Sequence, residues 1–170
     1  MNNVRPGRRD DRPVIAEIIN AAAEAYRGVI PDDRWHDPYM SSQELDAEIA
    51  AGVVFWVVES GASVIGVMGI QTVRDVDLIR HAYVRPGNQR HGVGAALITH
   101  LQSLTSRRML VGTWAVATWA VHFYERHGFV LVSTDQKNAL LRSYWTIPER
   151  QIEASVVLAN PDYGQAVIRR

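Results

Sequence analysis

Apolar residues recur with helical spacing in the first part of the chain. They fall at intervals of three and four positions between residues 10 and 26, at Val14, Ile15, Ile18, Ile19, Ala22 and Ala25. This spacing is typical of an amphipathic helix. Asp10 or Asp11 is expected to cap its start, with Pro13 in the first turn.

A long loop and a second helix are expected next. Two prolines and a glycine interrupt residues 26–40, which also carry several aromatic side chains. The second helix is predicted from Ser41 or Ser42 to about Ala51. Ser41 and Glu44 have the spacing of a capping box, in which each side chain bonds to the backbone of the other residue.

The middle of the chain changes to the pattern of strands. Apolar runs at residues 53–59, 64–70 and 76–84 are separated by turn signals, which predicts three antiparallel strands. A helix is expected from about Gly92 to Ser106, followed by a strand at 109–117. A strand, a helix and a further strand form a crossover unit, whose two strands are parallel neighbours.

The last part of the chain alternates between the two patterns. Thr118 is expected to cap a helix that runs to about His127, with Gly128 as a left-handed cap after it. Strands are expected at 129–133 and 152–159, and the segment between them is expected to be irregular or partly helical. The predicted order of elements is that of a mixed-sheet α/β domain, with a further strand left open before the first helix.

Composition limits the class of protein. A length of 170 residues suits one domain over residues 1–170, and 18 basic residues balance 18 acidic ones. Neutral charge argues against electrostatic binding to nucleic acid or an anionic membrane. The chain has no cysteine, which excludes disulfides and Cys-ligated zinc, and no metal site is predicted. No signal peptide or membrane-spanning stretch is recognisable, so a cytoplasmic protein is expected.

A loop with three glycines, VRPGNQRHGVG, joins the strand at 76–84 to the helix at 92–106. A Walker loop would end in Gly-Lys-Ser/Thr, but two alanines follow Gly94. A dinucleotide fingerprint would have a small residue where Leu97 stands. The remaining interpretation is a Gln/Arg-x-x-Gly-x-Gly/Ala pattern over residues 89–94, in which helix amides and Arg90 bind an anion. The alternative is a glycine turn that only caps a helix.

A second motif lies about thirty residues downstream. The segment WAVHFYERHGFVLV places Ala120, Phe123 and Tyr124 on a helix, and Gly128 and Phe129 lead into a strand. Together the two motifs resemble the GNAT superfamily of acyl-CoA N-acyltransferases over residues 53–134. The resemblance implies an α/β (α+β) fold with a central mixed, mostly antiparallel sheet of six to seven strands, flanked by helices and splayed in the middle.

The resemblance also implies a site for acetyl-CoA (coenzyme A). Loop amides of the family bind the pyrophosphate, and the end of the preceding strand pairs with the pantetheine arm. Carried over to this sequence, the cofactor-binding residues are Gln89, Arg90, His91, Gly92, Val93, Gly94, Ala95, Ala82, Tyr83, Val84 and Phe123.

The family's usual general acid corresponds to Tyr124. A phenol with a pKa of about 10 can supply a proton to a leaving thiolate, whose pKa is about 8.5. A packed aromatic residue is the alternative role. The family often has Asn where Ala117 stands, so that contact with pantetheine is missing or is replaced by Thr118.

The sequence offers more than one candidate for the general base. The position that is often acidic in the family is Leu78, and Asp77 and His81 are the nearby candidates. Regular strand alternation would place both opposite Leu78 and Arg80, but a bulge would reverse this. His81 has a suitable intrinsic pKa for a catalytic base. A buried structural histidine, a relay through water, or an amine that arrives neutral are alternatives.

The acceptor pocket of the family is formed by the first two helices, their loop and the segment before the last strand. Here these segments offer Tyr26, Trp35 and Tyr144, with Asp32 and Asp33 nearby, which suits a cationic amine. The resemblance implies an N-acetyltransferase that moves an acetyl group to a small-molecule or peptide primary amine by direct attack in a ternary complex. The alternative is a catalytically weak CoA-binding regulatory module of the same fold. A homodimer through an exposed edge strand stays open.

Overall fold

The computed structural model describes residues 2–160. Contacts divide these into two compact units, which are described separately. The first consists of residues 2–72 and 79–106, and the second of 73–78 and 107–160. The prediction of a single domain over 1–170 stays a prediction. None of the helices described within residues 2–160 combines the length and the apolar character needed to cross a bilayer.

The sheet of the first unit contains four strands. Its members in spatial order are β1 (Asn2–Pro6), β2 (Val54–Ser60), β3 (Ser63–Val73) and β4 (Val76–Val84). β1 pairs with β2 and β2 with β3, both antiparallel, and a register shift lies between Val58 and Glu59. β1 is the further strand before the first helix that the sequence pattern left open. β3 extends beyond its predicted end at residue 70 to Val73, which is the first residue of the second unit.

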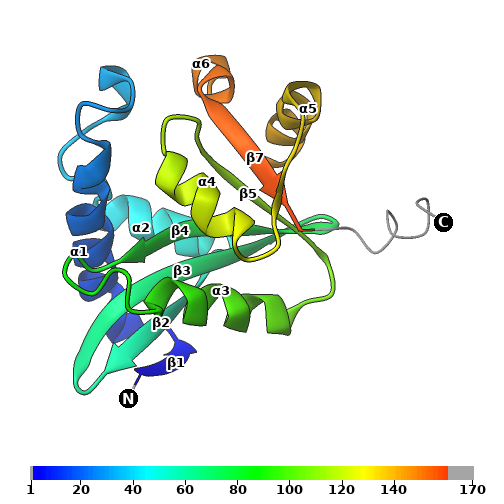
Figure 1. Cartoon of the computed structure of the whole chain (residues 1–170). Helices are drawn as coiled ribbons and strands as arrows, with labels where there is room; N and C mark the ends of the chain where they lie inside the picture. Colours follow the sequence, from blue (N-terminus) through cyan, green and yellow to red (C-terminus); the bar gives the residue numbers. More distant parts are fainter. Residues whose placement is uncertain (1, 161–170) are drawn as a thin grey trace. The chain divides into compact units, whose positions relative to one another are not determined.

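Three helices cover this sheet. They are α1 (Arg12–Ala23), α2 (Ser42–Ala50) and α3 (Val93–Leu104), with short 3-10 turns at Arg9–Asp11, Glu24–Tyr26 and Asp32–Arg34. Apolar residues of α1 and α2 form one core with β2 and β3, which includes Ile15, Ile18, Leu45, Phe55 and Val67. α3 packs at the opposite face (Figure 1), where Val93 and Leu97 lie against Gly66 of β3.

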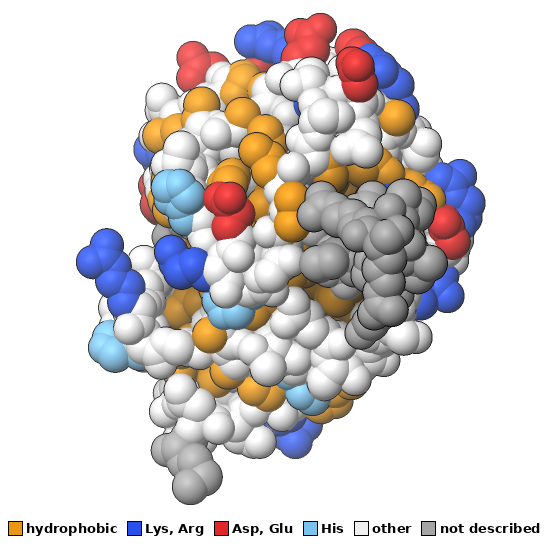
Figure 2. Space-filling model, turned by 45° about the vertical axis from the view of Figure 1, so that its right-hand side comes forward, with side chains coloured by type: hydrophobic (Ala, Val, Ile, Leu, Met, Phe, Trp, Pro, Cys, Tyr) orange, Lys and Arg blue, Asp and Glu red, His pale blue; other side chains and the backbone are white. Residues whose placement is uncertain are grey.

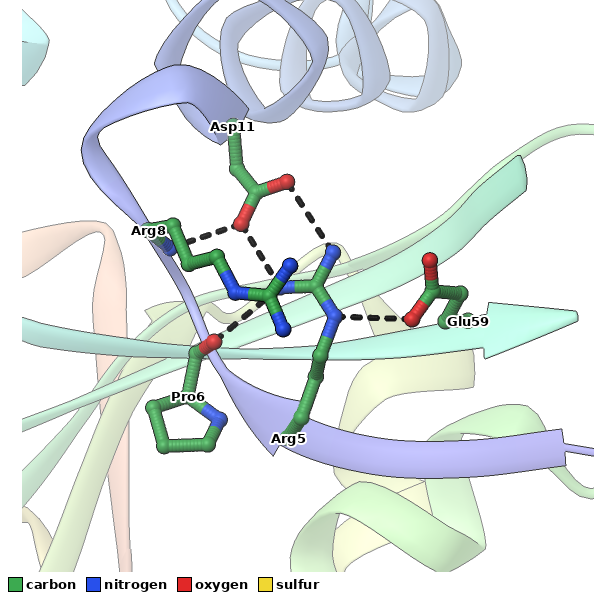
Figure 3. Close-up of polar contacts among 5 residues, drawn as sticks. All are labelled: Arg5, Pro6, Arg8, Asp11 and Glu59. Carbon is green, nitrogen blue, oxygen red and sulfur yellow. Dashed lines mark hydrogen bonds and ion pairs between the residues drawn. The ribbon is translucent and has the colours of Figure 1, made fainter. Parts of the chain in front are cut away.

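A network of ion pairs between side chains joins β1 to the start of α1 and to β2. Arg5 donates to Asp11 at 2.7 and 3.1 Å and to Glu59 at 2.8 Å, and Asp11 also accepts from the backbone N–H of Arg8 at 2.6 Å (Figure 3). The bonds from Arg5 lower the pKa of Asp11 below its ordinary value. Asp11 occupies the N-cap position of α1, but its side chain makes no hydrogen bond to the first turn of this helix. The prediction that the Asp11 side chain caps α1 is therefore wrong.

The second unit has its own strands and helices. β4 begins in it, and β5 (Arg108–Trp114), β7 (Ser155–Ala159) and β6 (Val130–Leu131) follow in spatial order, with both later pairs antiparallel. The helices are α4 (Thr118–Glu125), α5 (Thr134–Tyr144) and α6 (Glu149–Glu153). Leu78, Leu110, Leu141 and Val157 belong to its apolar core. Seven mostly antiparallel strands with flanking helices confirm the predicted α/β class.

Three local predictions for this unit need correction. The segment expected to be irregular contains α5, which begins with a capping box between Ser133 and Gln136. The last strand begins only at Ser155, because α6 occupies the residues before it. Ala117, not Thr118, is the N-cap of α4, and it caps without a side-chain bond. A capping-box spacing was readable at Ser133, as it was at Ser41, where the structure confirms it.

The surface carries both signs of charge. Acidic and basic side chains are interspersed on the face that Figure 2 shows, as expected for equal numbers of each. Exposed large apolar side chains in the second unit include Val130 and Leu131, which are 60% and 46% exposed and form the short strand β6.

Candidate functional site

The glycine loop leaves β4 through a series of left-handed residues. Gly87, Arg90 and Gly92 have φ angles of 93°, 65° and 76°, and Asn88 N–H donates to the carbonyl of Arg85 at 2.9 Å in a tight turn. Glycine adopts positive φ without steric cost, which explains two of these positions. Residues 89–92 are exposed, so their backbone is open to a ligand.

The start of α3 differs from the starts of α2 and α5. Both of those helices have a serine cap that bonds to a first-turn amide and a complete capping box. α3 begins after Gly92 without a side-chain cap and has no acidic residue in its first turn. The first-turn amides of any helix lack intrahelical acceptors, and here no side chain of the cap takes one up. Together with the exposed Arg90, this donor set fits an anion such as a pyrophosphate.

The end of β4 is fixed where the loop begins. Arg85 N–H donates to the carbonyl of Ile65 at 2.8 Å, and the Arg85 side chain donates to Glu17 of α1 at 2.6 Å. Gln89 Nε2 bonds to the carbonyl of Val84 at 3.4 Å. Ala82, Tyr83 and Val84 are half-buried. These contacts hold the strand end and the loop as one piece.

The backbone of β4 is irregular at His81, where φ is 54°. Adjacent residues of a regular strand point to opposite faces, yet Arg80 and His81 both reach the same carboxylate. Oε2 of Glu48 lies 2.9 Å from Arg80 Nη2 and 2.7 Å from His81 Nε2. The structure therefore contains the backbone irregularity that is needed to bring the side chains of Arg80 and His81 to the same carboxylate.

The cluster around Glu48 is partly buried. The side chains of Glu48, Arg80 and His81 are 28%, 24% and 18% exposed. The hydrogen bond from His81 is the main cause that lowers the pKa of Glu48, and the charge of Arg80 lowers it further against the opposing effect of burial. Gln71 of β3 accepts from Arg80 at 2.8 Å, and Phe55 packs near the His81 ring at 6.0 Å between centroids. Glu48 was missed from the sequence because it lies 33 residues from His81.

The other positions considered for a base lie in the second unit. Leu78 is fully buried in the apolar core of that unit, which explains why this position carries an apolar side chain and not a carboxylate. Asp77 is 3% exposed, and its carboxylate lies 3.7 Å from Nε of Arg107. At this exposure the Asp77 carboxylate is closed to an incoming amine, whereas the His81 side chain is 18% exposed. The geometry therefore favours His81 over Asp77.

Aromatic residues of the loop between α1 and α2 form a connected group. Tyr39 stacks on Trp35 at 5.4 Å and lies 6.1 Å from Tyr26, measured between ring centroids. Tyr26 in turn meets Tyr83 of β4 edge-on at 6.5 Å. Arg27 lies over the Trp35 ring at 4.7 Å, so this ring face accepts a cation. The structure thus brings Tyr26 and Trp35 into one group through Tyr39, a residue that the sequence did not single out.

In the second unit, Tyr124 is packed among aromatic rings. It is 5% exposed, and its ring centroid lies 5.1 Å from that of Phe123 and 5.7 Å from that of Phe129, both edge-on. His127 Nδ1 lies 2.8 Å from the carbonyl oxygen of Phe123, and the two rings are 4.7 Å apart. These contacts fix the orientation of the phenol.

Tyr144 is held by its own neighbours in that unit. Its hydroxyl donates to Asp75 at 2.7 Å, and the Arg74 guanidinium lies 4.7 Å from the ring centroid. The bond to Asp75 raises the pKa of Tyr144 and lowers that of Asp75. Residues 2–160 contain no group of three or more His, Asp or Glu side chains placed to hold a metal ion.

Comparison with known proteins gives one consistent result. Residues 51–131 match the model of the acetyltransferase (GNAT) domain. No curated protein sequence matches the chain. Among solved structures, the PaiA N-acetyltransferase from Thermoplasma acidophilum in complex with coenzyme A has a TM-score of 0.72 and 13% identity, covering 94% of this chain and 98% of that one.

Two other similar structures belong to enzymes with different acceptors. The ribosomal-protein-S18-alanine N-acetyltransferase from Escherichia coli has a TM-score of 0.67 and 18% identity, covering 95% of this chain and 94% of that one. N-acetylglutamate synthase from Neisseria gonorrhoeae, complexed with coenzyme A and L-arginine, has a TM-score of 0.61 and 20% identity, covering 95% of this chain and 33% of that one. At these identities the likeness concerns the fold.

Proposed function

We propose that this chain, of which residues 51–131 match the acetyltransferase (GNAT) domain, belongs to the GNAT superfamily and is an acetyl-CoA-dependent N-acetyltransferase that acts on a primary amine. The observation that carries the proposal is the start of α3. α2 begins with a serine cap and has an acidic residue in its first turn. α3 has neither, and it follows a loop in which Arg90 and Gly92 have positive φ angles. Bare helix amides are suited to a phosphate group.

The CoA site is assigned to the loop and the strand before it. The amides of residues 89–95 and the side chain of Arg90 would bind the pyrophosphate. The backbone of residues 82–84 would pair with the pantetheine arm as an added strand. Phe123 is assigned to the same cosubstrate. Acetyl-CoA supplies an activated acyl carbon and a thiolate leaving group.

The chemistry is assigned to two residues of this chain. His81 accepts the proton that the amine must lose before it attacks, and Tyr124 donates a proton to the departing thiolate. His81 is supported by its polar and partly exposed surroundings. Tyr124 is supported by its place in the Phe-Tyr pair on α4 and by a ring held between two aromatic neighbours.

The acceptor is assigned to a cationic amine of a small molecule or peptide. Tyr26 and Trp35 offer aromatic faces, and the Trp35 ring already holds a guanidinium from the chain itself. Tyr144 in the second unit is the third proposed acceptor residue, supported by a half-buried ring whose face already holds the Arg74 guanidinium.

Tyr124→Phe tests the chemical assignment. Turnover of acetyl-CoA with an accepted amine should fall on the order of 10²-fold, because the thiolate then leaves unprotonated. The dissociation constant for acetyl-CoA, measured by calorimetry, should stay the same because the ring is retained. Unchanged turnover would remove Tyr124 from the mechanism.

A CoA-binding regulatory module of the same fold is the second candidate. The observation that favours it is Leu78, a fully buried hydrocarbon at a position often acidic in the family. Binding of acetyl-CoA without release of free CoA across a panel of amines would support this candidate. Release of CoA that depends on an amine would support the enzyme.

A further inference from the structure

The carboxylate of Glu48 determines how His81 can exchange protons. Its Oε2 atom lies 2.7 Å from His81 Nε2 and 2.9 Å from Arg80 Nη2. The contact with His81 and the charge of Arg80, whose guanidinium is a donor in every state, both lower the pKa of Glu48 and favour the ionised carboxylate. An ionised carboxylate only accepts hydrogen bonds, so Nε2 must carry its hydrogen. In a neutral imidazole this leaves the lone pair on Nδ1.

The neighbours of the cluster keep this arrangement in place. Arg80 also donates to Gln71 of β3, and Gln71 Nε2 donates to the carbonyl of Ala51 at the end of α2. Phe55 of β2 packs near the His81 ring. Within residues 2–160, the charged partners of His81 in this cluster are Glu48 from α2 and, through Glu48, Arg80 from β4. The neighbours from β2 and β3, Phe55 and Gln71, are uncharged.

We propose that Glu48 is a positioning residue, which holds His81 in the Nε2–H tautomer and makes Nδ1 the atom that takes the proton of the substrate amine. The proposal rests on the proposed acetyltransferase function. The ammonium of the substrate gives a proton to Nδ1, and the freed nitrogen lone pair attacks the acetyl carbon. A C–N bond forms and the C–S bond breaks. The second proton that the nitrogen loses on becoming an amide balances the proton that the departing sulfur gains, so the products are the N-acetylated amine, the CoA thiol and protonated His81. Glu48 touches none of the reacting atoms.

The first test measures the tautomer and needs neither an acceptor nor turnover. The protein, with ¹⁵N-labelled histidine, is studied by NMR at a pH where the ring is neutral. His81→Gln identifies the signal among the six histidines. A protonated Nε2 and an unprotonated Nδ1 are expected. The opposite tautomer would overturn the proposal, even if the protein proves to be an active acetyltransferase.

Glu48→Gln is the informative variant, because an amide can donate to Nε2 and so favour the opposite tautomer. We expect the Nε2–H preference to be lost and kcat to fall on the order of 10²-fold with a small change in KM. The matched control is Asp46→Asn on the same helix. It removes an exposed ion pair with Arg12 at 2.7 Å and should leave kcat unchanged.

The pH profile separates positioning from a structural role. A primary amine becomes neutral as the pH approaches about 10.4, and a base is then no longer needed. The kcat deficit of Glu48→Gln should therefore shrink as the pH rises. A deficit that is equal at every pH, or no deficit, would contradict the proposal. Circular dichroism verifies that the variant is folded, and if it is not, the wild-type tautomer decides alone.

Discussion

Gly66 of β3 gives a direct test of how the sheet supports the glycine loop that is proposed to bind CoA. A Cβ added at this residue would lie 2.5 Å from Cγ1 of Val93 and 3.4 Å from Cδ1 of Leu97. Val93 is 2% exposed and is the first residue of α3, immediately after the glycine loop. Gly66→Ala therefore pushes on the helix end that is assigned to the pyrophosphate.

The size of the effect follows from the distances. Carbon atoms pack at about 3.5–4.0 Å, so Val93 must move by roughly 1 Å. Overpacking of this kind costs about 1–3 kcal/mol. Replacing glycine by alanine within a strand returns about 0.5–1 kcal/mol. We expect a net loss between about 0 and 2.5 kcal/mol in the free energy of unfolding.

Urea denaturation and calorimetry measure the two consequences. The variant should have a lower unfolding midpoint and weaker binding of CoA. In the double variant with Val93→Ala, the clash is removed, so the two substitutions should couple favourably by about 0.5–3 kcal/mol. Additive effects on unfolding, or a Gly66→Ala variant more stable than wild type, would refute the packing described for β3 and α3.

Two further substitutions probe the same unit by other means. Gly92 has φ of 76°, and an added Cβ would meet no atom within 4 Å. Gly92→Ala should therefore cost about 1 kcal/mol of backbone strain and weaken CoA binding, which calorimetry measures. Equal affinity for CoA would show that this backbone conformation is not needed for binding. Asp11→Asn should lower the free energy of unfolding by about 1–3 kcal/mol at neutral pH, measured in urea, because it breaks the contacts with Arg5. The folded pKa of Asp11 is lowered from 3.8, so its contribution is complete above that pH and is lost as the pH falls through the lowered value; a difference between wild type and variant that persists at lower pH would contradict this origin.

Local sequence patterns predicted the parts of the fold that depend on neighbouring residues. The capping box at Ser41 and the glycine after α4 are examples, since each is set by contacts within a few positions. The helix α5 had the same kind of signal at Ser133 and was readable in principle. β6 is shorter than its apolar run suggests because only two residues pair with β7.

The candidate base required the structure. Strand alternation alone places Arg80 and His81 on opposite faces, and only the positive φ at His81 brings both to Glu48. No spacing rule connects a glutamate on α2 to a histidine 33 residues later. The loop assigned to CoA was visible in the sequence because its glycines and the following helix are contiguous.

The central claim is that this protein transfers an acetyl group from acetyl-CoA to an amine. The most direct measurement is an incubation with acetyl-CoA and a panel of primary amines, read out as free CoA thiol and as N-acetylated product by mass spectrometry. The account predicts thiol release that depends on the amine and matches the product formed. Failure to bind acetyl-CoA, or binding with no product from any amine, would contradict it.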